Sequence, residues 1–209
     1  MNPPRTSTRL AATLLVTAAY LALSAVSVGC GGGNDSSSGS TSAVAIFTPD
    51  TPVAAEGSIT LLPGTKTGAS VSVRVTVTQL ADFFGAGFRI TYDATALLFN
   101  GMDDSTSFLR DGVTDPNQLI FIADAANAPG QIVITATRVS PAVPVPLVST
   151  TSDLVILNFV ARRAILPLAE EGRLEFVDPK QACDGTVADD DECGDITVTA
   201  WEGGGVSAQ

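Results

Sequence analysis

The side chains that could carry out chemistry are carboxylates, cysteines and a few aromatic residues, because the chain of 209 residues contains no histidine. The absence of histidine excludes a Ser-His-Asp triad, a Cys-His pair and a His-ligated metal. The adjacent carboxylates Asp103 and Asp104 could in principle hydrolyse a glycoside, but that reaction needs two carboxyl groups facing each other across a cleft. Neighbours in one loop rarely meet this requirement, so we expect that the chain is not an enzyme.

An acidic run, formed by Asp189, Asp190, Asp191 and Glu192, offers the oxygen ligands that Ca²⁺ prefers. Its spacing does not match an EF-hand loop, which needs acidic residues at alternate positions, a central glycine and a final glutamate. We therefore expect a solvated acidic loop and no cofactor, and we keep these four residues as weak candidates for a calcium site.

Cys183 and Cys193 lie on either side of the acidic run. In an exported protein, which meets an oxidising compartment, two such cysteines are expected to form a disulfide. Closing so short a loop would stabilise the fold by about 2–3 kcal/mol if the effect is one of chain entropy. The bridge would hold the connection into the last strand, and Cys30 would be left as the odd cysteine.

Trp201 is the candidate for stacking against a ligand such as a sugar ring. The other large aromatic residues mostly sit in apolar alternation, which is typical of a core; they are Phe83, Phe84, Tyr92 and Phe121. Trp201 instead lies near the end of a predicted strand, where an aromatic ring can remain exposed.

The first 29 residues have the parts of a secretory signal, with two early arginines followed by the uncharged, apolar residues 10–28. Gly29 and Cys30 come next, and a small residue before a cysteine at the end of such a run resembles the lipobox of bacterial lipoproteins. The resemblance implies cleavage before Cys30 and lipidation of Cys30. One departure is Ser27, which stands where that family prefers leucine.

Two other interpretations of this leader stay open. Residues 10–28 are long enough to remain as a membrane-spanning anchor. Alternatively the leader is cleaved in the ordinary way and Cys30 is incidental. Residues 30–42 are rich in Gly and Ser, which predicts a flexible tether. We expect an exported protein anchored to a membrane at the cell envelope, with its folded domain in the periplasm or outside the cell.

The net charge of −11 reflects 22 acidic and 11 basic residues. Because Arg5 and Arg9 lie in the leader, the exported chain would carry nine basic residues and a net charge of −13. A chain this acidic is a poor candidate for binding nucleic acid. We interpret the charge as solvation of the protein surface.

Alternation of apolar and polar residues predicts an all-β fold. It is strictest at residues 70–78, and it recurs at residues 87–93, where Phe88, Ile90 and Tyr92 would point inward. Further strands are predicted at residues 57–63, 97–99, 118–123, 131–139, 154–160, 172–177 and 195–201. With about eight or nine strands and no convincing helix, residues 57–209 are predicted to form a β-sandwich. Residues 43–56 would be an extended lead-in that could include an edge strand.

The order of these segments resembles the cohesin domain and its carbohydrate-binding-module relatives. In that family a strand of the form G-F-x-[hydrophobic]-x-Y-D is followed by a short turn and an apolar strand, which residues 87–93 and 97–99 match. A later family strand is matched by residues 152–160, and the final one by residues 196–198 with Gly205 and Val206. The resemblance covers residues 57–209.

The resemblance implies a nine-stranded jelly roll that is not an enzyme. Cohesins of cellulosomes bind calcium-loaded dockerin modules, and related domains bind polysaccharides. The function expected from it is a non-catalytic binding or scaffolding module of the cell envelope that recognises a dockerin-type protein or a polysaccharide. The alternatives are a structural envelope lipoprotein without a discrete ligand and, less favoured, a carboxylate-based glycoside hydrolase. The single module and the lipid-type leader depart from a typical cellulosome component.

Overall fold

The computed structural model describes residues 43–139, 148–187 and 193–209, and these residues form an all-β domain. The strands are β1 (Ala45–Pro49), β2 (Ser58–Thr67), β3 (Ser70–Thr78), β4 (Phe83–Thr91), β5 (Leu97–Asp103), β6 (Leu119–Asp124), β7 (Gln131–Arg138), β8 (Thr151–Ala161), β9 (Arg173–Val187), β10 (Cys193–Asp195), β11 (Ala200–Glu202) and β12 (Gly204–Ala208). The helical elements of the described residues are three short 3₁₀ turns, η1 (Phe108–Arg110), η2 (Pro116–Gln118) and η3 (Glu170–Gly172).

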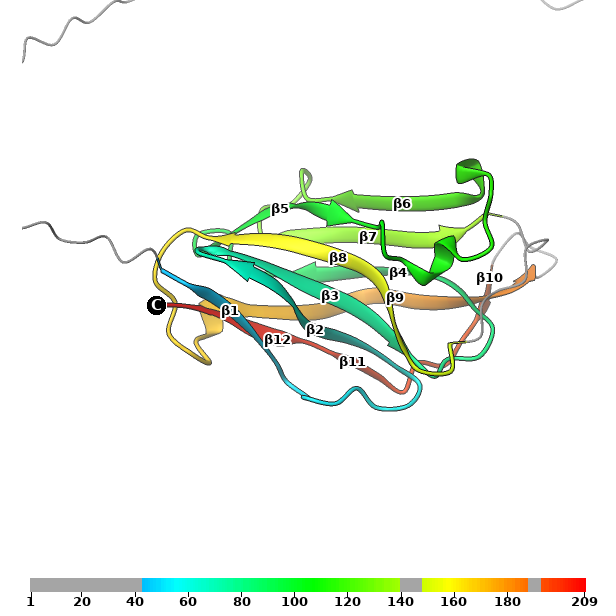
Figure 1. Ribbon diagram of the computed structural model, residues 1–209, viewed down its shortest axis with the longest axis horizontal. Helices are drawn as coiled ribbons and strands as arrows, with labels where there is room; N and C mark the ends of the chain where they lie inside the picture. Colours follow the sequence, from blue (N-terminus) through cyan, green and yellow to red (C-terminus); the bar gives the residue numbers. More distant parts are fainter. Residues whose placement is uncertain (1–42, 140–147, 188–192) are drawn as a thin grey trace, which may run out of the picture. The chain divides into compact units, whose positions relative to one another are not determined.

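The strands are arranged in two sheets (Figure 1). The seven-stranded sheet has the order β1-β12-β9-β4-β7-β6, with β10 added beside β9, and the five-stranded sheet has the order β11-β2-β3-β8-β5. Neighbouring strands are antiparallel except for β11 and β2, which are parallel. The predicted jelly-roll β-sandwich is confirmed.

The core lies between the sheets, and alternation along the strands fills it. On β3, Val71, Val73, Val75 and Val77 are all buried, as their spacing predicts. On β4 the inward residues Phe88 and Ile90 lie between polar or small neighbours. Burying one such side chain contributes about 1.5–3 kcal/mol, so this alternation fixes which face of each strand is inside.

The turn after β4 reverses the chain into the second sheet. The Asp93 carboxylate accepts hydrogen bonds from the Thr95 backbone N–H and hydroxyl, each at 2.7 Å. The Ala96 and Leu97 backbone N–H groups donate to the Asp93 carbonyl. This turn explains why the alternation of residues 87–93 stops before the apolar residues of β5 begin.

The predicted number of nine strands is wrong, because the described residues form twelve. The single strand predicted at residues 195–201 is divided between β10 and β11. The Ile196 N–H donates to the Ala182 carbonyl on β9, whereas the Thr199 N–H donates to the Gly57 carbonyl beside β2. The chain therefore crosses from one sheet to the other within a segment that alternates like one strand.

Two other segments depart from the predicted pattern. Ala45–Pro49, within the predicted lead-in, is the edge strand β1 and pairs with β12, Phe47 lying opposite Val206. The strand predicted at residues 172–177 continues to Val187. No helix within the described ranges is long and apolar enough to cross a membrane. The predicted leader and tether, residues 1–42, lie outside those ranges.

Candidate binding surface

The outer face of β6, β7, β4 and β9 carries apolar side chains that no other element covers. Directly opposite residues form a row across these strands: Ile122 on β6, Thr135 on β7, Gly87 on β4 and Gln181 on β9. Ile122 is 54% exposed, and Ile120 and Val133 on the same strands are also exposed. We call this surface the open face; it comprises Ile120, Ile122, Val133, Thr135, Gly87, Arg89 and Gln181.

Glycine keeps the centre of the open face low. A Cβ atom built on Gly87 would meet no other atom within 4 Å, so the missing side chain leaves open space. A shallow hollow lies there and is lined by Gly87, Arg89, Val133, Thr135, Pro179 and Gln181 among others. Such a preformed surface, flat with a central depression, suits the docking of another molecule.

Arg89 supplies the positive charge in this hollow. Val133 and Val177 lie directly opposite Arg89 on the two neighbouring strands, so the cation stands between apolar side chains. Within the described residues its guanidinium makes no hydrogen bond or ion pair. Arginine is enriched at binding hot spots, and this one retains its donors for a partner.

The outer face of the five-stranded sheet differs, because its polar side chains bind one another. Ser72 on β3 donates to the side-chain oxygen of Asn158 on β8 at 2.7 Å, and Thr65 on β2 donates to Ser72. Arg74 and Asp153 form an ion pair at 3.2 Å. These groups already have partners, so the open face is the better candidate for a binding surface.

A second hollow lies beside Trp201. It is lined by the polar residues Lys180, Gln181, Asp195 and Thr197, together with Ala182, Ile196, Val198 and Trp201. The Trp201 ring packs against Phe88 and Phe176, with centroid distances of 5.8 and 5.2 Å, and the residue is only partly exposed. Trp201 therefore contributes to the core from the edge strand β11, and stacking of a ligand on it stays a prediction.

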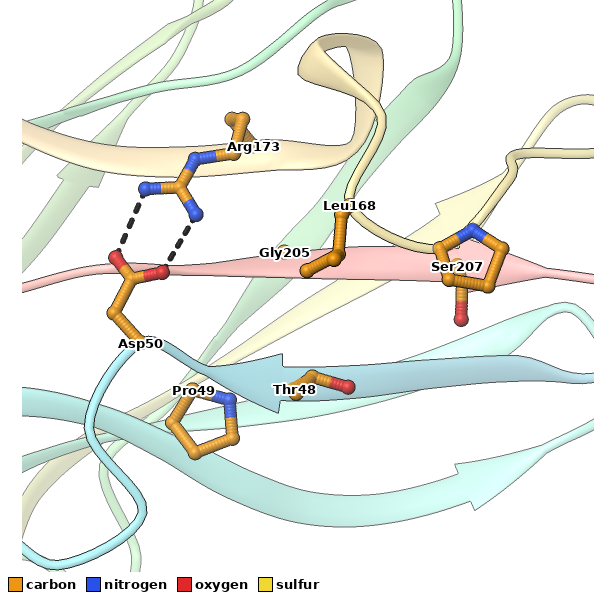
Figure 2. A pocket seen from close by; sticks show the side chains of 8 residues that line it. Thr48, Pro49, Asp50, Leu168, Arg173, Gly205 and Ser207 are labelled. Carbon is orange, nitrogen blue, oxygen red and sulfur yellow. Dashed lines mark hydrogen bonds and ion pairs between the residues drawn. The ribbon is translucent and has the colours of Figure 1, made fainter.

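A third hollow lies over β1 and β12 (Figure 2). Arg173, at the start of β9, donates two hydrogen bonds to the Asp50 carboxylate at 2.6 and 2.9 Å. These bonds raise the pKa of Arg173 above its ordinary value. The ion pair joins the end of β1 to β9, which is a structural role, and the hollow otherwise contains the exposed side chain of Leu168.

The adjacent carboxylates Asp103 and Asp104, which we did not expect to be catalytic, each have a separate partner. Asp103 accepts a hydrogen bond from the Ser105 N–H at 2.8 Å, and this bond lowers the pKa of the Asp103 carboxyl. Asp104 instead pairs with Arg110. In the part of the chain that the structure describes, no group of three or more acidic or cysteine side chains could hold a metal ion.

Several of the remaining predicted residues lie outside the described ranges. The candidate calcium ligands Asp189, Asp190, Asp191 and Glu192 lie outside the described residues, as does Cys30. β10 pairs antiparallel with β9, with Cys193 opposite Val187 and Asp195 opposite Cys183. This pairing brings the two cysteine-bearing strands together, and the disulfide stays a prediction.

The residues of the open face were not singled out from the sequence, although a signal was present. Residues 119–123 are apolar at both odd and even positions, and a strand with one buried face needs only one of these sets. Leu119, Phe121 and Ala123 pack against the core, which leaves Ile120 and Ile122 outside.

A two-sheet β-sandwich with one uncovered, partly apolar sheet face defines a class of binding modules. A family model, the cohesin domain, matches residues 56–166, which is more than half of the chain. The chain belongs to the cohesin domain family, whose members are non-catalytic protein-interaction modules. None of the curated proteins compared with it matches the chain.

Solved structures of cohesin modules are similar to this chain. The sixth cohesin of Acetivibrio cellulolyticus scaffoldin B, in complex with a mutant Cel5 dockerin, is 19% identical, with 75% of this chain and 94% of that chain covered and a TM-score of 0.44. A type II cohesin from the cellulosome of Acetivibrio cellulolyticus is 15% identical, with 78% and 94% covered and a TM-score of 0.47. A type I cohesin in complex with a dockerin, from Clostridium thermocellum, is 14% identical, with 69% and 95% covered and a TM-score of 0.47.

Proposed function

We propose that this protein is a cell-envelope receptor that binds a dockerin-type protein through the open face. Family membership supports a protein partner, and the exposed Ile120, Ile122 and Val133 support this face. An apolar centre excludes water on docking, while the Arg89 guanidinium pairs with a carboxylate or carbonyl of the partner. The single observation that carries the proposal is the contrast between this uncovered face and the internally bonded face of the other sheet.

The experiment is capture of partners from the organism's own secreted and envelope fractions, with the partner identified by mass spectrometry. Parent protein is compared with Ile122→Asp and with the control Leu98→Asp, because Ile122 and Leu98 are exposed aliphatic residues on edge strands of opposite sheets. A charge buried in the interface should weaken binding by about tenfold or more. We expect loss with Ile122→Asp and retention with Leu98→Asp.

Calcium dependence separates the kinds of partner. A dockerin-type partner holds its own Ca²⁺, so a chelator should abolish capture of it. Capture that persists in chelator, or that Ile122→Asp leaves unchanged, would contradict the proposal. If no partner is captured from any fraction, the alternative of a structural envelope protein without a discrete ligand is favoured.

We further propose that the chain is exported and anchored to a membrane through its leader. Lipidation at Cys30 is the favoured anchor, because a small residue and a cysteine end the apolar run of residues 10–28. Mass spectrometry of the protein extracted from membranes tests it. A mass consistent with an acylated N-terminal Cys30 is expected, and an intact leader would instead indicate a membrane-spanning anchor.

A polysaccharide is the second candidate ligand, and the hollow beside Trp201 favours it. That hollow combines an aromatic ring with amide, carboxylate and hydroxyl groups, which are the groups that bind sugar rings. Two separate variants test this function. Gln181→Ala removes an amide from the hollow, and Trp201→Phe is a small change chosen because Trp201 also packs in the core. Unchanged retention of both folded variants on polysaccharide affinity gels would contradict this function.

A further inference from the structure

Four exposed apolar side chains lie at the start of β1 and in the loop beside it, and Leu168 of that loop shares a hollow with Thr48 and Asp50 at the other end of β1. Val44 and Ile46, at the start of β1, are 44% and 42% exposed, and Leu166 and Leu168, in the loop between β8 and β9, are 69% and 85% exposed. We call these four residues the apolar end. Figure 1 shows the start of β1, the C-terminus and this loop at the same end of the sandwich.

Hydrogen bonds hold the apolar end in place. The Ile165 N–H donates to the Ala208 carbonyl and the Ala208 N–H donates to the Ile165 carbonyl, each at 2.9 Å. The Val44 N–H donates to the Gln209 carbonyl at 2.8 Å. The loop and the start of β1 are thus both attached to β12 and the residue after it, so their side chains are presented by a fixed backbone.

Leu168 is the least expected residue of this group. Its φ of +62° lies in the left-handed region, which glycine or asparagine adopts at lower cost than leucine. Packing does not compensate, since the side chain is almost fully exposed over the outer surface of β12 (Figure 2). An exposed leucine in a strained conformation is a reason to look for a contact outside the domain.

The chain before Ala43 indicates what that contact is. Cys30 precedes Ala43 by 13 residues, and residues 10–28 are apolar. A Gly/Ser-rich segment of this length spans about 20 Å on average. An anchor at Cys30 or in residues 10–28 therefore keeps this end of the domain close to the bilayer. The exposed apolar residues of the open face lie on other strands of the same sheet, β6 and β7.

The charge around the apolar end is compatible with a lipid surface. Lys66 lies beside the turn in which the Gly68 carbonyl accepts the Ala45 N–H, and the exposed Arg162 precedes the loop. Both cations can reach lipid phosphates while the leucines enter the interface. The acidic Glu170 and Glu171 follow in the same loop, where Arg163 pairs with Glu171 at 3.3 Å.

We infer that the apolar end docks onto the lipid surface, with Leu166 and Leu168 inserted at the boundary between headgroups and acyl chains. The inference rests on the proposed membrane anchorage and is independent of the proposed protein partner. Lipid contact gives the domain an orientation that a flexible tether alone does not supply.

Tryptophan quenching in vesicles tests this inference, because the chain contains a single tryptophan, Trp201. Full-length protein is reconstituted in phosphatidylcholine vesicles whose acyl chains are brominated near the headgroup. The variant is Leu168→Trp, and the matched control is Val53→Trp, since Val53 is 76% exposed in the loop beyond the other end of β1. We expect brominated lipid to quench the tryptophan at position 168 and to leave those at positions 53 and 201 unquenched.

A second variant separates lipid contact from fold stability. Leu168→Gly suits the left-handed backbone, so it should leave the fold unchanged or more stable. In a Leu166→Trp background the same change should reduce quenching at position 166, because one of the inserted side chains is lost. A purely structural role for Leu168 predicts no such reduction.

Three results would overturn the inference. Protein that pellets with vesicles, with no more quenching at position 168 than at position 53, contradicts lipid contact while leaving anchorage intact. Protein that does not associate with vesicles contradicts the anchorage as well. A blue shift at position 168 without vesicles, with a dimer in sedimentation, would assign the apolar end to contact between two copies of the chain.

Discussion

A buried arginine, Arg138, tests how the long loop between β5 and β6 is held. Arg138 is 2% exposed, and burial lowers the pKa of its guanidinium, which shows the cost of placing the charge there. Its Nε donates to the Leu109 carbonyl at 3.0 Å, and its Nη2 donates to the Asp111 carbonyl at 2.6 Å. The guanidinium therefore binds backbone groups on both sides of the end of η1.

We expect Arg138→Met to destabilise the protein by about 2 kcal/mol. The substitution removes the donor to the Leu109 carbonyl. Because Leu109 is fully buried, water cannot replace that donor, and an unpaired buried carbonyl costs about 1–3 kcal/mol. Asp111 is exposed, and water can replace the arginine at its carbonyl. The methionine relieves the burial of charge and packs in the same space, which offsets part of the loss.

The assay is urea unfolding followed by Trp201 fluorescence, because Trp201 packs against Phe88 and Phe176 in the folded state. The matched control is Arg162→Met, an exposed arginine whose loss should change the stability by less than about 0.5 kcal/mol. Hydrogen exchange at the Leu109 N–H detects loosening of the loop alone. An Arg138→Met variant as stable as the control, with unchanged exchange, would refute the reasoning.

Three further predictions concern the turn, the central strand and the cysteines. The hydrogen bonds from Thr95 lower the pKa of Asp93 below its ordinary 3.8. This carboxylate therefore contributes stability above pH 3.8, and the contribution is lost as the pH falls through the lowered pKa of the folded state. An NMR titration should show the pKa of Asp93 rising toward 3.8 in Thr95→Val, and no rise would count against the turn. Gly85→Ala should destabilise the folded domain by about 1–3 kcal/mol, because the new Cβ would lie 2.3 Å from the Thr137 hydroxyl. The control Gly87→Ala, on the same strand, should be close to neutral in urea unfolding. Equal effects of the two substitutions would contradict the described packing. Cys183 and Cys193 should resist alkylation until reduction, which should lower the free energy of unfolding by about 2–3 kcal/mol; alkylation of both without reductant would contradict the disulfide.

The sequence predicted the fold wherever a strand has one buried face and local partners. β3 and β4 follow their alternation closely, and the turn at Asp93 falls where the alternation stops. The division of residues 195–201 could not be predicted, because it depends on which strands lie nearby. The bonds from Ile196 to Ala182 and from Thr199 to Gly57 show that these residues belong to two sheets.

The sequence analysis also overlooked Arg138, although the alternation along β7 indicates that its side chain points inward. Ile132, Ile134 and Ala136 are buried at alternate positions of β7, and Arg138 is the next position in that series. Continuing the alternation places the arginine inside. What the sequence could not supply was its partner, since the Leu109 carbonyl is 29 residues away along the chain.

The open face and the apolar end are separate surfaces, and this separation matters for the proposed function. Ile122 and Gly87 lie on the outer face of β6 and β4, whereas Leu168 lies over β12, across β9 in the same sheet. A domain held by its apolar end can therefore still present the open face to a partner. Because the two surfaces share no residue, Leu168→Asp should leave the solution affinity for the partner unchanged, and Ile122→Asp should leave lipid contact unchanged. If either substitution impaired both activities, the two proposed surfaces would have to be treated as one.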